Sequence, residues 1–210
     1  MIGIIIQARM GSSRLPGKIL MDILPNQPML DLIIGRLHKS KLVDMIIIAT
    51  STSPADDILA ERFKTESEIK LYRGSETDVL SRYYECAKLY QLDTIIRVTA
   101  DCPAIDPMII DQLIVFYLKG GYDYASNVME RTYPRGFDAE IFSFKTLEWT
   151  FFNAVEPLER EHVTIGIYNR DKWKLGNMSS GHPEYAKYRL TVDTQADLDR
   201  LNTLPLSAFE

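Results

Sequence analysis

Short runs of aliphatic and β-branched residues recur along the first half of the chain and predict buried strands. These runs lie at residues 2–6, 45–50, 69–72 and 94–99. Apolar residues at helical spacing lie between them, at residues 29–41, from Ser53-Pro54 onward, and at 78–90. Strands that alternate with helices of this length are typical of βαβ units. The first half is therefore predicted to be α/β, with a mostly parallel sheet covered by helices on both faces.

In the second half of the chain the alternation of strands and helices is weaker. The pattern predicts a helix from Pro107 to the Gly120-Gly121 pair, strands at 122–125 and 140–144, a polar loop at 127–136, and helices at 145–154 and 159–170. A closing strand at 188–192 and a helix at 195–201 complete the prediction. Because no repeat or low-complexity tract interrupts the chain, we expect one domain, 1–210, with an inserted arm at about 125–180.

Composition excludes several classes of protein. Hydrophobic residues make up 46% of the chain and charged residues 25%, which is typical of a folded globular domain and not of a disordered or collagen-like one. A net charge of −5 argues against a nucleic-acid partner. The apolar runs are too short to cross a bilayer, and the first residues lack the pattern of a signal peptide. Cys86 and Cys102 form no Cys-x-x-Cys pair, which favours a reducing compartment. We therefore expect a cytoplasmic protein without a membrane or nucleic-acid partner.

The loop after the first predicted strand, residues 7–18, is the first candidate binding site. Ligands of open α/β sheets bind at the carboxyl ends of the strands, where this loop lies. It carries Arg9, Arg14 and Lys18 and no acidic residue, although the whole chain is negatively charged. Cations and backbone amides on one loop suit a polyphosphate, and each close cation–phosphate pair contributes about 4 kcal/mol of gross attraction. The alternative is an ordinary βα loop with solvated side chains. We call residues 7–18 the cationic loop.

The spacing of the cationic loop excludes two well-known phosphate-binding motifs. A P-loop has four residues between its glycines and a Ser or Thr after the lysine. Here Gly11 and Gly17 enclose five residues, and Ile19 follows Lys18. The chain also lacks Gly-x-Gly-x-x-Gly, so neither a P-loop kinase nor a Rossmann dehydrogenase is supported.

Two aspartates are candidate ligands of a metal ion at the same edge of the sheet. Asp101 follows the predicted strand at 94–99, and Asp193 follows the predicted closing strand. Mg²⁺ is commonly held by one or two carboxylates together with substrate phosphates. The alternative is that both are turn or N-cap aspartates, and the spacing to Asp197 is a capping signal. The shared edge with the cationic loop favours the metal.

Five segments of the chain together resemble one family. They are Gln-Ala-Arg-Met-Gly-Ser-Ser-Arg-Leu-Pro-Gly-Lys at 7–18, Asp-Val-Leu-Ser-Arg at 78–82, Arg-Val-Thr-Ala-Asp-Cys-Pro at 97–103, Arg-Glu-His-Val-Thr at 160–164 and Arg-Leu-Thr-Val-Asp-Thr at 189–194. They occur in the order seen in the spore coat polysaccharide biosynthesis cytidylyltransferases, which are related to the acylneuraminate and ketodeoxyoctonate cytidylyltransferases. The resemblance covers nearly the whole chain.

The resemblance implies a three-layer nucleotide-diphospho-sugar transferase fold, with a mixed, mostly parallel sheet between helices, and it implies roles for single residues. The phosphates of CTP would contact Arg9, Arg14 and Lys18, with help from Ala8 and Ser12. Asp101 and Asp193 would hold Mg²⁺, and Asp78 and Arg82 would lie near the nucleoside. The acceptor sugar would contact Asp138, Glu140, Arg160 and His162. Lys18, Arg14 and Asp101 are the implied catalytic residues.

The implied reaction is transfer of CMP from CTP to a sugar or sugar acid in surface polysaccharide biosynthesis, with release of pyrophosphate. Gln7 stands where the sialic acid enzymes have proline, and Ser13 where they have lysine, so a sialic acid acceptor is not assumed. Two alternatives stay open: a non-catalytic sugar-nucleotide binding protein, and a nucleotidyltransferase that uses another nucleoside triphosphate.

The resemblance also suggests a homodimer, with the arm at about 125–180 as the contact. Apolar side chains in the arm are compatible with such a contact, namely Phe142, Phe144, Trp149, Phe151 and Phe152. Aromatic residues at this spacing are equally compatible with a place in the core.

Overall fold

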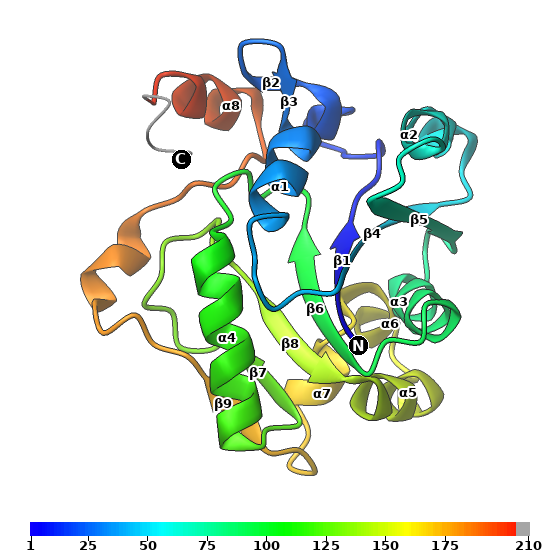
Figure 1. The fold of residues 1–210 in the computed structure, drawn as a ribbon, viewed down its shortest axis with the longest axis vertical. Helices are drawn as coiled ribbons and strands as arrows, with labels where there is room; N and C mark the ends of the chain where they lie inside the picture. The colour runs from blue at the N-terminus through cyan, green and yellow to red at the C-terminus, as the bar shows by residue number, and fades with distance from the viewer. Residues whose placement is uncertain (205–210) are drawn as a thin grey trace.

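The computed structural model describes residues 1–204, and its centre is a seven-stranded mixed sheet in the order β5-β4-β1-β6-β8-β7-β9 (Figure 1). The strands are β1 (Ile2–Gln7), β4 (Met45–Ser51), β5 (Ile69–Gly74), β6 (Thr94–Thr99), β7 (Tyr124–Ser126), β8 (Glu140–Ser143) and β9 (Leu175–Asn177). β1 pairs in parallel with both β4 and β6, and β4 pairs in parallel with β5. Only β8 runs antiparallel to its neighbours in this sheet of the described residues. The predicted mostly parallel sheet is confirmed.

Helices cover both faces of the sheet, so the fold has the three predicted layers (Figure 1). The α-helices are α1 (Met29–Leu37), α2 (Asp57–Phe63), α3 (Val79–Leu89), α4 (Pro107–Gly120), α5 (Phe144–Asn153), α6 (Pro157–His162), α7 (Ile165–Tyr168) and α8 (Gln195–Asn202). Short 3₁₀ helices are η1 (Lys18–Leu20), η2 (Pro54–Asp56) and η3 (Pro183–Lys187), and a hairpin joins β2 (Asp22–Leu24) to β3 (Gln27–Pro28).

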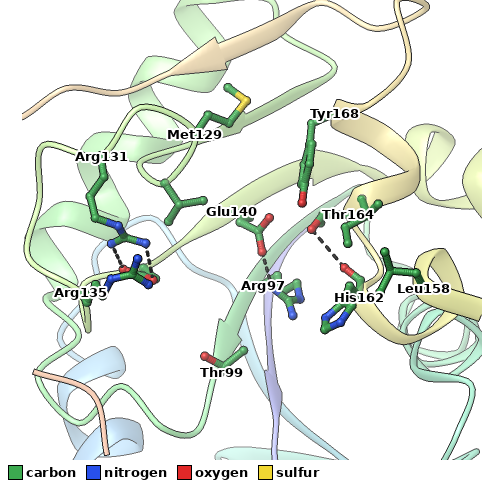
Figure 2. Close-up of a pocket in the computed structure, with 13 residues that line it drawn as sticks. Arg97, Thr99, Met129, Arg131, Arg135, Glu140, Leu158, His162, Thr164 and Tyr168 are labelled. Atoms are coloured by element: carbon green, nitrogen blue, oxygen red, sulfur yellow. Dashed lines mark hydrogen bonds and ion pairs between the residues drawn. The ribbon is translucent and has the colours of Figure 1, made fainter. Parts of the chain in front are cut away.

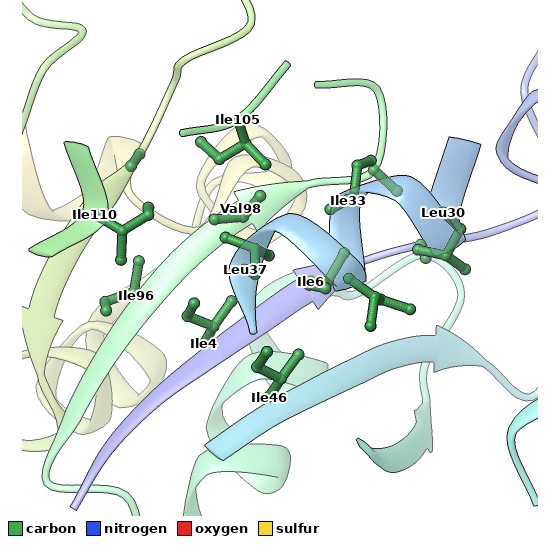
Figure 3. Packing of buried hydrophobic residues seen from close by; sticks show 14 of the residues in the cluster. Ile4, Ile6, Leu30, Ile33, Leu37, Ile46, Ile96, Val98, Ile105 and Ile110 are labelled. Carbon is green, nitrogen blue, oxygen red and sulfur yellow. The ribbon is translucent and has the colours of Figure 1, made fainter. Parts of the chain in front are cut away.

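The two faces of β1 enter two separate cores because side chains alternate along a strand. Ile4 and Ile6 are fully buried in the core beneath α1 and α4 (Figure 3). Ile5 is fully buried in the second core, which contains Leu80 and Tyr83 of α3. Each fully buried aliphatic side chain contributes about 1.5–3 kcal/mol through removal of apolar area from water. Burial on both faces explains why β1 is continuously apolar.

The prediction of a closing strand at 188–192 is wrong. The strand β9, for which the sequence offered no prediction, forms the edge of the sheet next to β7. The segment 188–192 makes only an isolated bridge between Arg135 and Arg189. Its backbone donors go to two different segments: Leu190 N donates to Arg135 O, and Val192 N donates to Asp101 O. Because the two donors have partners on different segments, residues 188–192 cannot form a continuous ladder of hydrogen bonds with one neighbouring strand. The predicted helix at 159–170 is likewise divided, because Val163 adopts φ 54° between α6 and α7.

The aromatic residues of the predicted arm at 125–180 differ in exposure. Phe142 is fully buried, whereas Phe152 is 69% exposed. Cys86 and Cys102 are free and buried, and burial raises the pKa of both thiols, as expected for packing residues. None of the helices in residues 1–204 is long and apolar enough to cross a membrane.

Candidate active site

The cationic loop folds back on itself at the carboxyl end of β1. The carbonyl of Met10 accepts hydrogen bonds from Ser12 N and Gly17 N, both at 2.9 Å. Gly17 adopts φ 72°, the left-handed conformation that glycine tolerates best, and this turn directs the chain into η1. The loop encloses a cavity of about 260 Å³, which we call the loop cavity, lined among others by Gln7, Arg9, Ser12, Arg14, Lys18, Thr99 and Asp101.

Asp193 reaches this cationic cluster from the far end of the chain. Arg14 Nη2 donates to Asp193 Oδ1 at 2.7 Å, and Lys18 Nζ lies 3.3 Å from the same oxygen. Arg189 Nη2 donates to the other oxygen, Oδ2, at 2.5 Å. Lys18 Nζ also donates to the carbonyl of Val192 at 2.6 Å. The side chains of Lys18 and Asp193 are only 12% and 16% exposed, so solvent screens the interaction between these two residues less than that of a surface ion pair.

Asp101 lies beside the segment that carries Asp193. Val192 N donates to the carbonyl of Asp101 at 2.9 Å, so the two segments are directly joined. Thr99 Oγ1 donates to Asp101 Oδ1 at 2.5 Å and orients the carboxylate. Asp193 was expected at a strand end; it arrives instead on an irregular segment held by this hydrogen bond.

The donor atoms at this place suit a hard divalent cation. Carboxylate oxygens are the ligands that Mg²⁺ prefers, and Asp101 brings them to the loop cavity. Asp193 lies on the neighbouring segment, but both of its oxygens are bonded to Arg14, Lys18 and Arg189, so it would hold the ion only by giving up part of these contacts. Within residues 1–204 there is no group of three or more His, Cys, Asp or Glu side chains placed to hold a metal. A magnesium ion here would therefore complete its coordination with substrate phosphates and water, as is usual for this ion.

A second, larger cavity of about 840 Å³ adjoins the loop cavity, and Thr99 lines both (Figure 2). We call it the large cavity. It contains three residues predicted to face the acceptor, Asp138, Glu140 and His162. The other lining side chains are Arg97, Val128, Met129, Arg131, Arg135, Leu158, Thr164, Ile165 and Tyr168.

The floor of the large cavity is a buried charged network. Glu140 is 6% exposed and forms an ion pair with Arg97 across the β6–β8 pairing. The hydroxyl of Tyr124 donates to Glu140 Oε1 at 2.7 Å. Burial alone would lower the pKa of Arg97, but the adjacent Glu140 carboxylate outweighs it and raises that pKa. Both oxygens of Glu140 thus have protein partners, which makes it a fixed part of the floor.

One wall of the large cavity is positively charged. Arg131 forms a two-pronged ion pair with Asp138, at 2.6 and 2.9 Å (Figure 2). The Arg135 side chain has no hydrogen bond to any described residue and is available to a ligand. Arg97, Arg131 and Arg135 are not among the site residues predicted from the sequence. The polar loop predicted at 127–136 contains Arg131 and Arg135, so their place outside a strand or helix was predictable but their role in a cavity was not.

The remaining predicted residues lie outside both cavities. Asp78 caps α3 by accepting from Ser81 N at 2.9 Å. Arg160 donates to Asp78 Oδ2 through Nη2 at 2.6 Å and Nε at 3.1 Å, which ties α6 to α3. Arg82 is fully buried; its Nη1 donates to Ser75 O at 2.8 Å, and burial lowers its pKa. Their contacts with substrate stay predictions.

Ala8 is 2% exposed at the start of the cationic loop and lines neither cavity. Its backbone N donates to Ala49 O at 3.3 Å, so Ala8 anchors the loop to β4. Ser12, by contrast, lines the loop cavity. The structure thus brings together Arg9, Ser12, Arg14, Lys18 and Asp101 at one cavity, with Asp193 bonded to Arg14 and Lys18.

Comparisons with known proteins agree with this geometry. The chain is 33% identical to the spore coat polysaccharide biosynthesis protein SpsF of Bacillus subtilis, over 98% of this chain and 87% of that protein. A solved cytidylyltransferase from Leptospira borgpetersenii superposes with a TM-score of 0.88 at 36% identity, covering 96% of this chain and 84% of the other. A CMP:2-keto-3-deoxy-manno-octonic acid synthetase solved with CTP has a TM-score of 0.69 and 19% identity, over 96% of each chain, and shares the fold.

The family model described as "Cytidylyltransferase" matches residues 3–208, nearly the whole chain. The match spans the cationic loop, Asp101 and Asp193, the groups that converge at the loop cavity. This chain therefore belongs to the cytidylyltransferase family.

Proposed function

We propose that this protein transfers CMP from CTP to a hydroxyl group of a sugar or sugar acid and releases pyrophosphate. One observation carries the proposal: the loop cavity and the large cavity meet at Thr99. A triphosphate in the first and an acceptor in the second would therefore bring their reacting atoms to a common boundary. Holding two reactants side by side is itself a large part of catalysis.

The loop cavity supplies the positive charge for the triphosphate. In the proposed step the acceptor hydroxyl oxygen bonds to the α-phosphorus of CTP, the bond to the bridging oxygen of the β-phosphate breaks, and the hydroxyl proton passes to solvent. Negative charge then grows on the departing pyrophosphate. Arg14 and Lys18 both line the loop cavity, and both already form ion pairs with the carboxylate of Asp193. Their positive charges would stabilise the negative charge that grows on the pyrophosphate.

Magnesium completes the proposal for the loop cavity. Asp101 and Asp193 would hold the ion, which when bound neutralises part of the phosphate charge. In the structure Asp193 accepts hydrogen bonds from Arg14 and Lys18, so these cations are already close to the place where phosphates would bind.

The large cavity is proposed to bind the acceptor. The free guanidinium of Arg135 suits a carboxylate or hydroxyl groups, and Met129, Leu158 and Tyr168 offer an apolar wall to the sugar ring (Figure 2). Two similar proteins support this class of acceptor, the spore coat polysaccharide biosynthesis protein and the CMP:2-keto-3-deoxy-manno-octonic acid synthetase.

A two-part experiment tests the proposed function. Calorimetry with the four nucleoside triphosphates in the presence of Mg²⁺ is expected to show preferred binding of CTP. A pyrophosphate-release assay over a panel of sugars and sugar acids is then expected to show turnover with at least one acceptor. Binding of CTP without turnover would indicate a non-catalytic binding protein, and preferred binding of another triphosphate would indicate a different base specificity.

We also propose a homodimer that uses the arm at about 125–180. Phe152 and Val155 are 69% and 81% exposed and lie on or just after α5, and such apolar exposure is typical of an interface. Light scattering on the purified protein measures the mass directly, and a monomer at all concentrations would contradict the dimer.

A further inference from the structure

The carboxylate of Asp56 is buried beneath the cationic loop, outside both cavities. Asp56 ends η2 and is only 2% exposed. Its Oδ1 accepts a hydrogen bond from Met10 N at 2.7 Å. Its Oδ2 accepts from Ser51 N at 3.2 Å and from the Ser51 hydroxyl. A buried carboxylate that binds three protein donors is held in one orientation, and losing any of these donors is costly.

Met10, which Asp56 holds, is the residue on which the cationic loop folds. While Met10 N donates to Asp56, Met10 O accepts from both Ser12 N and Gly17 N. These two hydrogen bonds close the segment between Met10 and Gly17, which contains Arg14 and is followed directly by Lys18. Because Met10 holds both ends of this segment, a shift of Met10 would displace the two cations that line the loop cavity.

The hydrogen-bond partners of Asp56 are themselves connected to the central sheet. Ser51 ends β4, which pairs directly with β1 in the middle of the sheet. From β5, Arg73 Nε donates to Ser51 O at 2.9 Å and Arg73 Nη2 donates to Ser53 O at 3.1 Å. The Asp56 carboxylate is thus connected to two strands of the sheet, and through Met10 it connects the loop to them as well.

We propose that Asp56 is a positioning residue for CTP: by holding Met10 it sets the path of the cationic loop and so the places of Arg14 and Lys18. The inference rests on the proposed function, because it assigns Asp56 a part in the same nucleotide site. Asp56 itself does not touch the substrate. The Asp56 carboxylate also lies near Arg82. Burial lowers the pKa of the Arg82 guanidinium, and the negative charge of Asp56 offsets part of that lowering.

The substitution Asp56→Ala removes both acceptor oxygens, so Met10 N and Ser51 N both lose this partner. We expect CTP affinity, measured by calorimetry well below the unfolding temperature, to fall about tenfold. Trypsin cleavage after Arg9 and Arg14 is expected to become faster, because a loosened loop is more accessible to the protease. KM for CTP is expected to rise, with KM for the acceptor unchanged.

Asp111→Ala is the matched control. Asp111 anchors a turn in the same manner, accepting from the Ser40 hydroxyl at 2.5 Å and from the N–H groups of Lys41 and Leu42, yet it lines neither the loop cavity nor the large cavity. It is expected to lose stability without losing CTP affinity. Equal losses of affinity in both variants, or wild-type affinity in Asp56→Ala, would overturn the inference.

A milder substitution covers the case in which Asp56→Ala does not fold. Ser51→Ala removes only the hydroxyl that orients the Asp56 carboxylate, and it is expected to give a smaller loss of CTP affinity with the same change in trypsin cleavage. Wild-type affinity and cleavage in Ser51→Ala would then overturn the inference. If the wild-type protein bound no CTP, the proposed function itself would fail, and the calorimetry of the unmodified chain shows that separately.

Discussion

The guanidinium of Arg14 and the carboxylate of Asp193 lie 2.7 Å apart, although 179 positions separate them in the chain. Asp193 also bonds to Arg189, so a single carboxylate joins the cationic loop to the C-terminal part of the described chain. In the proposed site, Arg14 and Lys18 also contact the triphosphate of CTP. Their ion pairs with Asp193 hold the two side chains close to the place proposed for the phosphates.

Arg14→Ala is expected to weaken CTP binding about 10- to 100-fold, since a hydrogen bond to a charged group contributes roughly 1.5–3 kcal/mol. Titration calorimetry measures the affinity. Arg62→Ala is the control, because Arg62 forms an ion pair with Asp31 and lines neither the loop cavity nor the large cavity. CTP affinity equal to that of the wild type would remove Arg14 from the nucleotide site.

Asp101→Ala is expected to abolish pyrophosphate release and leave the fold intact, because it removes one of two proposed metal ligands. Turnover is followed while Mg²⁺ is varied, with circular dichroism as the check on folding. Asp106→Ala is the control: Asp106 caps α4 by accepting from Met108 N at 2.7 Å, and it lines neither the loop cavity nor the large cavity. A folded Asp101 variant with unchanged turnover would show that this aspartate is an ordinary turn residue.

Arg135→Ala is expected to raise KM for an anionic acceptor at least tenfold and to leave KM for CTP unchanged, because its guanidinium lines only the large cavity of the two. Initial rates with each substrate varied in turn separate the two constants. Lys172→Ala is the control, since that side chain packs over Trp149. A rise in KM for CTP alone would place Arg135 at the nucleotide instead.

Gly136→Ala is expected to lower the free energy of unfolding by about 3 kcal/mol. Gly136 has φ 111°, and an added Cβ would lie 2.8 Å from the backbone carbon of Leu190. Gly121→Ala is the matched control, expected to cost about 1 kcal/mol, because Gly121 has φ 58° but open space around it. Urea denaturation measures both, and equal losses would show that the contact with Leu190 is unimportant.

Asp197→Asn is expected to reduce stability by about 1 kcal/mol near neutral pH, since it breaks the capping box of α8. Burial tends to raise the pKa of Asp197, but hydrogen bonds from Asp193 N, Thr194 N and the Thr194 hydroxyl outweigh it and hold that pKa below its ordinary 3.8. A lowered pKa in the folded state stabilises the protein above pH 3.8, and this contribution is lost as the pH falls through the folded pKa.

Urea denaturation of wild type and Asp197→Asn at pH 7 and pH 2 tests this sign. The difference in stability is expected to shrink at the lower pH. Asp199→Asn, on the same helix, is the control, because among residues 1–204 Asp199 accepts from the Gln195 side chain and takes no part in the capping box. A difference that stayed constant with pH would contradict the lowered pKa.

Local patterns in the sequence were sufficient for most of the fold. The continuously apolar β1 and β4 were predictable because strands buried on both faces need apolar side chains at every position. The cationic loop was predictable because charge and glycine spacing are local properties. The predicted strand at 188–192 failed because strand formation needs one continuous partner, and that segment divides its hydrogen bonds between Arg135 and Asp101.

The order of strands and helices in the first half, the place of the cationic loop at a strand end, and the candidate carboxylates Asp101 and Asp193 can all be predicted from the amino-acid sequence. Which of these groups meet depends on the folded chain. It placed Asp193 on Arg14 and Lys18, paired Arg160 with Asp78 away from both cavities, and buried Asp56 under Met10. The reason is physical: periodicity and composition describe neighbours along the chain, whereas ion pairs and hydrogen bonds between distant segments depend on how the packed sheet and helices bring those segments together.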